Sequence, residues 1–418
     1  MELCKVIKGN NVEYKILDSE NIKEYLYSIE DIKNYFENDD LDINEIGDGN
    51  LNYVFIIKSK KDKNKALILK QAVPFLRCVG EEFPLSKERM TFEIRALQEF
   101  YKSTPDFIPK IYDANEEMSA LVMQFLDTHI IMRYGMIDKV VYPNFSEHIS
   151  EYLSNNLFKT SSLYLDSTTK RKQTDRFNSN TELCKLTEDF VFSFAFMENE
   201  TNDPYSKGHK EFEKLVANVE FKKQVLNLKY KFMTKNDALL HGDLHTGSIM
   251  LNKDETFVID PEFAFVGPFG FDIGALLGNL TMSYVSHIAL ANEEYAKWVF
   301  TTIDEVLEKF EDKFLSLWKK QKDSALIIDG FVDDSSLEQF KKDFMCDILK
   351  ESAGFAGCKM ARRMFGIAGV ADIREIEDLD IRDKAIELTL KIATRFVIEH
   401  QTLDGKEKIL NIIKEEIK

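Results

Sequence analysis

The chain has 418 residues, which is more than one hydrophobic core normally supports, so we expect two lobes. Hydrophobic residues make up 44% of it and the formal net charge is −17, a globular composition with an acidic surface. This charge argues against a general nucleic-acid binder and against binding to anionic membranes, because both need a basic surface.

The cysteines indicate a reducing compartment. There are five, they are scattered, and none forms a CxxC pair, so neither a disulfide framework nor a structural zinc site is expected. The first residues turn polar at once, and the longest apolar stretch, 266–282, is interrupted by glycines and an aspartate. We therefore expect a cytoplasmic protein without a signal peptide or a membrane span.

The first part of the chain, residues 1–126, has the pattern of a small sheet with one or two helices. Residues 19–37 and 86–101 carry apolar side chains at helical spacing. The segments rich in β-branched and apolar residues, which predict strands, are 43–57 (two strands around a glycine turn), 65–72 and 120–126.

The second part, residues 127–418, changes to long helical patterns. The polar stretch 159–182 predicts a surface helix with its loops, and the exception to the helices is a strand pair at 248–252 and 256–259. From residue 281 to the end the pattern is almost entirely helical. The fold class predicted is therefore α+β, with a small antiparallel-sheet N-terminal lobe, a large helical C-terminal lobe and a ligand cleft.

The strongest chemical signal is the sequence HGDLHTGS at 241–248, followed after the strand pair by Asp260, Pro261 and Glu262. Asp260 follows Asp243 by 17 residues, so a hairpin could return Asp260 and Glu262 beside Asp243. Three converging acids suit phosphoryl transfer, in which one carboxylate accepts a hydroxyl proton and the others hold Mg²⁺ on nucleotide phosphates. The alternative is that Asp243 caps a turn and Asp260 ends a strand.

Two further elements favour a nucleotide site. Gly47, Gly49 and Asn50 lie in a turn between strands, where glycines let the backbone approach a phosphate, although most such turns only join hairpins. Lys70 lies in an otherwise apolar strand, and a buried lysine is costly unless it is paired. Glu93, beside the apolar stripe of the next helix, could supply the partner; a snorkelling lysine and a solvated glutamate are the alternatives.

Five features follow one another along the chain: the glycine turn, the strand lysine, the helix glutamate, the HGD sequence and the DxE motif at the end of a strand. This order resembles that of the protein-kinase-like fold. Within it, the chain resembles the branch of aminoglycoside and choline kinases, and most closely the 5-methylthioribose kinase family. The stretches that carry this resemblance are GDGNLNYVF (47–55), LILKQAVPFLRCVGEEFPL (67–85), ELCKLTEDFVF (182–192), HGDLHTGSI (241–249), VIDPEFAFVGPFGFDIGALLGNL (258–280) and GFAGCKMARRMFGIAGVADI (354–373).

The resemblance implies that Asp243 is the catalytic aspartate, which contacts the substrate as base or orienting group for the sugar hydroxyl. It also implies that Asp260 and Glu262 are Mg²⁺ ligands. Protein kinases have Asn where this chain has Ser248, and Glu262 is expected to compensate. If the backbone around Pro261 is extended, Asp260 and Glu262 project their carboxylates to the same side.

The resemblance further implies ATP as co-substrate. Lys70 would contact the α- and β-phosphates, and residues 124–126 match the hinge whose backbone binds adenine. The expected ATP-binding residues are Gly47, Gly49, Asn50, Lys70, Gln124, Phe125, Leu126, Asp260, Pro261 and Glu262.

Arg362 and Arg363 lie among small and apolar residues in a predicted helix, which is typical of an anion site. The resemblance implies that they bind the sugar and the developing phosphate charge; one arginine paired to a surface acid is the alternative. Adjacent helical residues point about 100° apart, so both need not contact one ligand. Asp272 is predicted to cap a helix, and the resemblance implies that it braces the catalytic loop from behind. His245 is given no catalytic role.

The function expected from the resemblance is an ATP-dependent kinase that phosphorylates the anomeric hydroxyl of 5-methylthioribose in methionine salvage, acting as a homodimer. One alternative is a related kinase with another sugar, an aminoglycoside or an amino alcohol as acceptor, and the two arginines argue against cationic acceptors. Another is a nucleotide-binding scaffold without turnover. The presence of Lys70, Asp243, Asp260 and Glu262 argues against the scaffold.

Overall fold

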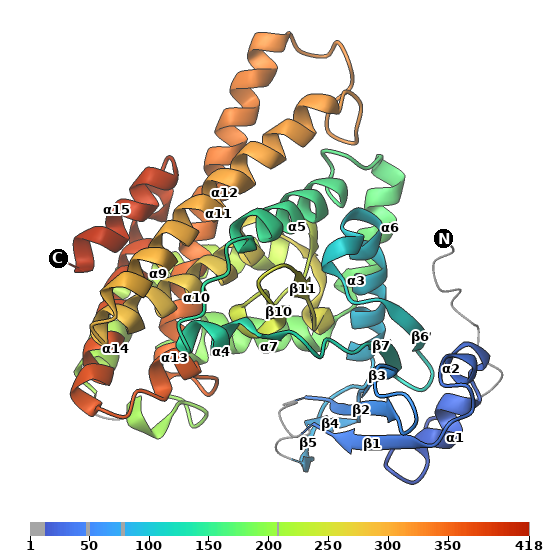
Figure 1. Cartoon of the computed structure of the whole chain (residues 1–418). Helices are drawn as coiled ribbons and strands as arrows, with labels where there is room; N and C mark the ends of the chain where they lie inside the picture. Colours follow the sequence, from blue (N-terminus) through green and yellow to red (C-terminus); the bar gives the residue numbers. More distant parts are fainter. Residues whose placement is uncertain (1–12, 47–50, 77–79, 207–208, 418) are drawn as a thin grey trace. The chain divides into compact units, whose positions relative to one another are not determined.

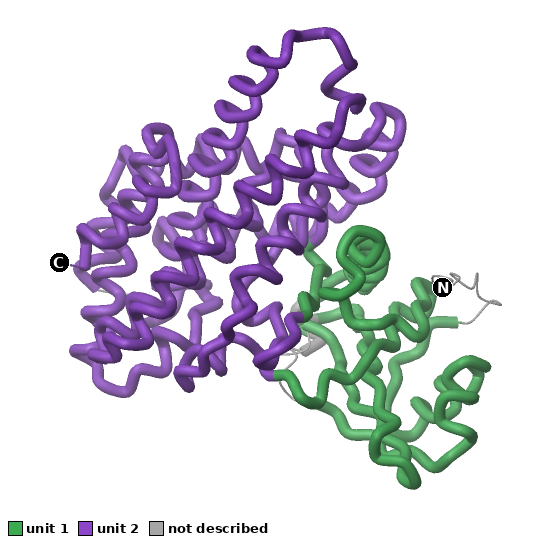
Figure 2. Tube along the Cα trace, turned by 45° about the horizontal axis from the view of Figure 1, so that its top comes forward, with its two compact units in different colours: residues 1–129, 257–263 green, residues 130–256, 264–418 purple. Residues whose placement is uncertain are grey.

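The computed structural model describes residues 13–46, 51–76, 80–206 and 209–417. The chain divides into two compact units (Figure 2). Unit 1 comprises Met1–His129 and Phe257–Phe263, and unit 2 comprises Ile130–Thr256 and Ala264–Lys418. The short segment after residue 256 therefore returns to the first unit and carries the DxE motif with it.

Unit 1 is built on a five-stranded antiparallel sheet with the strand order β1-β2-β3-β7-β6. Its strands are β1 (Leu41–Glu45), β2 (Tyr53–Ser59), β3 (Ala66–Gln71), β6 (Ile111–Asn115) and β7 (Ala120–Gln124). Side chains alternate along the central strand β3. Leu67 and Leu69 enter the core with α1 (Ile22–Tyr27) and α2 (Glu30–Tyr35), whereas Lys70 points to the opposite face.

The local predictions for unit 1 are largely confirmed, with three differences. The helix predicted at 19–37 is divided into α1 and α2, because Ile29 takes an extended conformation between them. The sequence analysis missed β6 and the two-stranded pair of β4 (Phe75–Leu76) and β5 (Gly80–Pro84). The amphipathic segment at 86–101 forms α3 (Arg89–Ser103), followed by the 3-10 turn η1 (Pro105–Phe107).

Unit 2 is mainly helical (Figure 1). Its α-helices are α4 (Met132–Ile137), α5 (Phe145–Lys159), α6 (Ser167–Asn178), α7 (Thr181–Phe192), α8 (Lys210–Ala217), α9 (Val219–Thr234), α10 (Gly270–Ala289), α11 (Glu293–Lys320), α12 (Asp334–Phe365), α13 (Ala371–Arg374), α14 (Leu379–Glu399) and α15 (Lys406–Ile417). Its short strands and 3-10 turns include β8 (Ile130–Ile131), β9 (Ala238–Leu240), η4 (Thr246–Ser248), β10 (Ile249–Leu251) and β12 (Phe265–Gly267). Strand β11 (Thr256–Val258) begins at the last residue before the chain returns to unit 1. Strand β12 pairs with β9, and β10 pairs with β8.

Glycines let α12 pack closely against α10. A Cβ atom at Gly274 of α10 would lie 2.5 Å from the carbonyl oxygen of Ser352, and one at Gly278 would lie 3.0 Å from that of Ala356. These distances leave no room for a side chain at Gly274, so backbone meets backbone there. The close packing brings the buried C-terminal half of α12 next to the catalytic loop.

Two further observations concern the expected compartment. Among the described residues, no helix has both the length and the apolar content of a membrane span. The described cysteines, Cys184, Cys346 and Cys358, are free thiols, and burial raises the pKa of Cys184 to about 12.

Candidate active site

In unit 1, Lys70 links two acidic side chains. Its Nζ atom lies 2.8 Å from the carboxylate of Glu93, and it also forms an ion pair with Asp260. The side chain of Glu93 is fully buried and that of Lys70 is 5% exposed, whereas that of Asp260 is 47% exposed. Burial raises the pKa of Glu93, and the charge of Lys70 opposes this. The predicted pairing of Lys70 with Glu93 is confirmed.

The backbone turns sharply at Asp260. Its φ angle is +69°, in the left-handed region that aspartate tolerates better than most residues, and Pro261 begins the 3-10 turn η5 (Pro261–Phe263). The extended geometry expected between Asp260 and Glu262 is therefore wrong. The turn leaves the carboxylate of Asp260 half exposed, while the side chain of Glu262 is 7% exposed.

Glu262 is held by two side chains from elsewhere in unit 1. Its Oε2 atom accepts a hydrogen bond of 2.8 Å from Asn52 and lies 3.7 Å from Nε of Arg89. Arg89 also donates to Oδ1 of Asn52 at 2.9 Å and to the carbonyl oxygens of Leu51 and Ser86 at 2.8 and 2.7 Å. Arg89 therefore ties the start of α3 to both the DxE motif and the residues that follow the glycine turn.

Of the two acids of the DxE motif in unit 1, Asp260 is the one accessible enough to bind Mg²⁺. Within the described residues, no group of three acidic, histidine or cysteine side chains could hold a metal ion. Asp243 belongs to unit 2 whereas Asp260 and Glu262 belong to unit 1, so the convergence of these three acids stays a prediction. Mg²⁺ is usually held by one or two carboxylates, with phosphate oxygens and water completing the octahedron. Asp260 fits this requirement because its carboxylate is half exposed, whereas Glu262 already accepts from Asn52.

The predicted hinge follows β7. The N–H of Gln124 donates to the carbonyl oxygen of Lys110 at 2.8 Å, and the ring of Phe125 lies 5.1 Å from the ammonium of Lys58. Leu126 is buried, and the binding of adenine by the backbone of residues 124–126 stays a prediction. The predicted residues of the glycine turn, Gly47, Gly49 and Asn50, lie outside the described residues.

In unit 2, Asp272 braces the loop that carries Asp243. Its two carboxylate oxygens accept from the backbone N–H groups of His241 and Gly242 at 2.6 and 3.0 Å. Burial raises the pKa of Asp272 to about 6, and these two hydrogen bonds oppose the rise. The predicted brace is confirmed. The predicted N-cap is wrong, because Phe269 occupies that position and Asp272 lies inside the first turn of α10.

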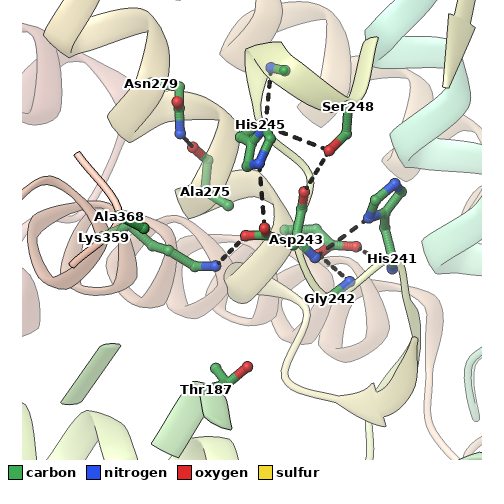
Figure 3. Close-up of polar contacts among 12 residues, drawn as sticks. Thr187, His241, Gly242, Asp243, His245, Ser248, Ala275, Asn279, Lys359 and Ala368 are labelled. Carbon is green, nitrogen blue, oxygen red and sulfur yellow. Dashed lines mark hydrogen bonds and ion pairs between the residues drawn. The ribbon is translucent and has the colours of Figure 1, made fainter. Parts of the chain in front are cut away.

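Both carboxylate oxygens of Asp243 have a partner (Figure 3). Oδ1 lies 2.9 Å from Nζ of Lys359, and Oδ2 lies 3.2 Å from Nε2 of His245. The N–H of Gly247 donates to Nδ1 of His245 at 2.9 Å, so the ring proton is on Nε2 and is donated to Asp243. His245, for which the sequence predicted no catalytic role, therefore contacts Asp243 directly.

Electrostatics keep Asp243 ionised and His245 neutral. Burial alone would raise the pKa of Asp243, but the attraction of Lys359, and then of His245, holds it well below its usual range. Burial lowers the pKa of His245 to about 4, against the opposing effect of Asp243. At neutral pH the pair is an aspartate anion that accepts from a neutral imidazole.

Arg362 and Arg363 follow Lys359 by three and four residues, so all three lie on one face of α12. The arginines are 8% and 6% exposed, and both act electrostatically on Asp243. Arg363 donates to the carbonyl oxygen of Ala368 at 3.0 Å. The Nε atoms of both arginines are buried without a hydrogen-bond partner among the described residues. The alternative of a surface ion pair is therefore wrong, because both arginines are buried, and the anion site expected here stays a prediction.

Arg133 is a site residue that the sequence analysis missed. Its guanidinium lies 3.3 Å from the carboxylate of Asp372 and donates to Asn279 at 3.0 Å. A Cβ atom at Gly247 would lie 3.1 Å from Nη1 of Arg133, so the guanidinium lies against the catalytic loop. No local pattern marks Arg133, whereas the spacing of Lys359 with the two arginines was visible in the sequence.

The comparisons with known proteins agree with this geometry. The model of the phosphotransferase enzyme family matches residues 42–306. Methylthioribose kinase 1 of Oryza sativa subsp. japonica is 41% identical over 356 residues, which are 82% of this chain and 82% of that protein. This chain belongs to the methylthioribose kinase family.

Another member of the methylthioribose kinase family, from Bacillus cereus (strain AH187), is 40% identical over 353 residues and covers 84% of this chain and 86% of its own length. Among solved structures, a choline kinase from Cryptosporidium parvum aligns with 96% of this chain and 98% of its own at 14% identity and a TM-score of 0.45. The family predicted from the sequence motifs is confirmed, as are the phosphotransferase class and the α+β fold class.

Proposed function

We propose that this protein transfers the γ-phosphoryl group of ATP to the anomeric 1-hydroxyl of 5-methylthioribose, giving 5-methylthioribose 1-phosphate and ADP. The observation that carries the proposal is the buried group around Asp243. An ionised carboxylate lies beside Lys359 at 2.9 Å, and two arginines of the same helix face keep unpaired N–H groups. The relatives at about 40% identity carry the name methylthioribose kinase.

In the proposed reaction, the sugar 1-hydroxyl oxygen bonds to the γ-phosphorus as the bond to the β–γ bridging oxygen breaks. ADP leaves with that electron pair, and the hydroxyl proton passes to Asp243. The low pKa of Asp243 makes it a weak base. Its main contribution is therefore to orient the hydroxyl and to accept the proton as the new P–O bond forms.

In unit 1, Lys70 would bind the α- and β-phosphates while Glu93 holds its ammonium in place. The backbone of residues 124–126 would bind adenine. Asp260 would hold Mg²⁺, which would neutralise charge on the phosphates, and Glu262 would join it by giving up its hydrogen bond from Asn52. Asp260 now pairs with Lys70, so binding of the nucleotide would exchange this ion pair for contacts to phosphate.

Arg362 and Arg363 would bind the sugar hydroxyls and the charge that develops on the transferred group. Arg133 and Lys359 add two more cations, against the two acids Asp243 and Asp372. This cationic surplus disfavours choline and aminoglycosides, whose positive charges would be repelled. A neutral sugar that becomes a phosphate dianion fits it better.

The proposal is tested by an ATP-consumption assay over a panel of pentoses, 5-methylthioribose, choline and an aminoglycoside, with ³¹P NMR of the product. We expect turnover of 5-methylthioribose with phosphate on the anomeric carbon. Turnover of another acceptor without turnover of this sugar would overturn the substrate assignment alone. Lack of ATP consumption with every acceptor would favour the nucleotide-binding scaffold.

Three broader assignments belong to the same proposal. The product would enter methionine salvage, the protein would act in the cytoplasm, and it would form a homodimer. Light scattering of the purified chain tests the dimer, since it distinguishes one chain mass from two.

A further inference from the structure

Lys359 lies on a helix that packs closely against its neighbour in unit 2. It is on α12, whose backbone is held against α10 at Gly274 and Gly278. Its side chain is 3% exposed, and its ammonium lies 4.6 Å from the ring centroid of Phe271. A buried lysine loses its hydration, so it is retained at a cost to stability unless it has a compensating partner.

That partner is the catalytic carboxylate. Lys359 contacts Oδ1 of Asp243, and His245 contacts Oδ2 from the catalytic loop (Figure 3). The two contacts come from separate segments of the chain. Lys359 on α12 is 116 residues from Asp243, whereas His245 lies in the same loop as Asp243. Each oxygen of the carboxylate is therefore fixed by its own donor, so rotation about the bond to the carboxyl carbon is restrained.

We propose that Lys359 is a positioning residue for phosphoryl transfer: it holds the carboxylate of Asp243 ionised and in the orientation that receives the sugar hydroxyl. The inference rests on the proposed function of Asp243. His245 is the second half of the same clamp. Lys359 contacts Asp243 and acts through it.

The groups that face this carboxylate explain why Lys359 dominates. Those that act on it are Lys359, Arg362 and Arg363 on α12, His245 in the catalytic loop and Asp272 on α10. Arg133 on α4 and Asp372 on α13 act on Arg363, and Nδ1 of His241 accepts from the backbone N–H of Asp243. His245 is neutral at neutral pH, and no hydrogen bond joins either arginine to Asp243 among the described residues. Lys359 is the cation in direct contact, and its attraction is the largest effect that opposes burial of Asp243.

A second reading is that the ion pair only anchors the catalytic loop to α12. The two readings predict different results. If the ion pair is only an anchor, its loss weakens folding and lowers kcat at every pH. A lost positioning cation leaves a desolvated carboxylate that takes up a proton as the pH falls, so activity acquires a new acid limb.

The test uses the full-length chain with Lys359→Met, which removes the charge, and Lys359→Arg, which keeps it. Lys350→Met on the same helix is the matched control, because Lys350 pairs with Asp347 outside the site. Two quantities are measured: the pH profiles of kcat and kcat/KM with 5-methylthioribose, and the pKa of His245 by NMR, its signal assigned by loss in His245→Asn.

We expect Lys359→Met to lower kcat at least about tenfold with KM values within about threefold, and to shift the acid limb up by about one pH unit or more. The pKa of His245 rises from about 4, since Asp243 then acts on it without the competing lysine. Lys359→Arg restores part of kcat and returns the acid limb toward that of the wild type. Lys350→Met changes none of these.

A pH profile parallel to that of the wild type, or an unchanged His245 titration in a folded Lys359→Met variant, would overturn the inference. If Lys359→Met does not fold, Lys359→Gln gives the same two readouts with a neutral hydrogen-bond donor. If the wild type does not phosphorylate 5-methylthioribose, the proposed function fails, and the His245 titration still decides whether Lys359 governs the charge state of Asp243.

Discussion

Replacing Lys70 with Met tests the energetics of the unit 1 site. Lys70 lies 2.8 Å from Glu93, whose side chain has no exposed surface. Burial already raises the pKa of Glu93, and Lys70 is the largest opposing influence. Without Lys70, the buried carboxylate must either remain charged at high cost or take up a proton.

The expected cost of Lys70→Met is about 3–5 kcal/mol in the free energy of unfolding at pH 8, the range for breaking a buried ion pair. Without Lys70, burial would hold the pKa of Glu93 above its value in the unfolded chain. The raised pKa also fixes the sign of the pH dependence. Below the unfolded pKa Glu93 is protonated in both states, and the cost grows as the pH rises toward the folded pKa.

The assay is urea unfolding followed by far-UV circular dichroism at pH 5 and pH 8, without nucleotide. The double variant Lys70→Met with Glu93→Gln carries no buried charge at this pair and should lose less than about 2 kcal/mol. Lys65→Met, which removes a surface pair with the 78% exposed Glu37, should change stability by less than about 0.5 kcal/mol. A small, pH-independent cost for Lys70→Met would refute the argument that Glu93 depends on Lys70.

Three other predictions follow from the same geometry. Asp243→Asn should keep ATP affinity, measured by calorimetry, and lower kcat by about two orders of magnitude or more; retention of most of kcat would make Asp243 a loop cap. In titrations of activity against free Mg²⁺, Glu262→Gln should raise the Mg²⁺ requirement and cut kcat severely. Ser248→Ala, which loses a 3.1 Å hydrogen bond to the Asp243 carbonyl oxygen, should have a milder effect. A larger effect of Ser248→Ala would contradict the compensation by Glu262. Gly274→Ala should cost about 1–3 kcal/mol in urea unfolding, since its Cβ would meet the carbonyl oxygen of Ser352 at 2.5 Å, and an unchanged midpoint would argue against close packing there.

Residues in contiguous motifs were predictable from the sequence. Asp243 and its loop are marked by HGDLHTGS, and the brace from Asp272 was expected from the segment that follows. The pairing of Lys70 with Glu93 was also predictable, because a lysine in an apolar strand requires a nearby acid. These interactions depend on residue type and on the local periodicity of strands and helices.

Predictions that assumed regular backbone were wrong. The extended geometry expected from Asp260 to Glu262 is replaced by a positive φ angle and a 3-10 turn. Asp272 lies in the first turn of α10 rather than at its N-cap. In both cases contacts with distant residues decide the conformation, as with Glu262 and Asn52, which are 210 residues apart.

The sequence by itself determined the family, the strand and helix content of each half, and the acids and arginines of the site. The tertiary structure alone decided which charges meet. Lys359 contacts Asp243 because glycines let α12 approach α10, and Arg133 reaches the same loop from α4. Hydrophobic periodicity fixes which face of an element is buried, but it does not say which buried polar groups lie opposite each other. The pairing of buried polar groups depends on how elements far apart in the chain pack together. Because these groups are desolvated, an unpaired one costs more free energy there than at the surface.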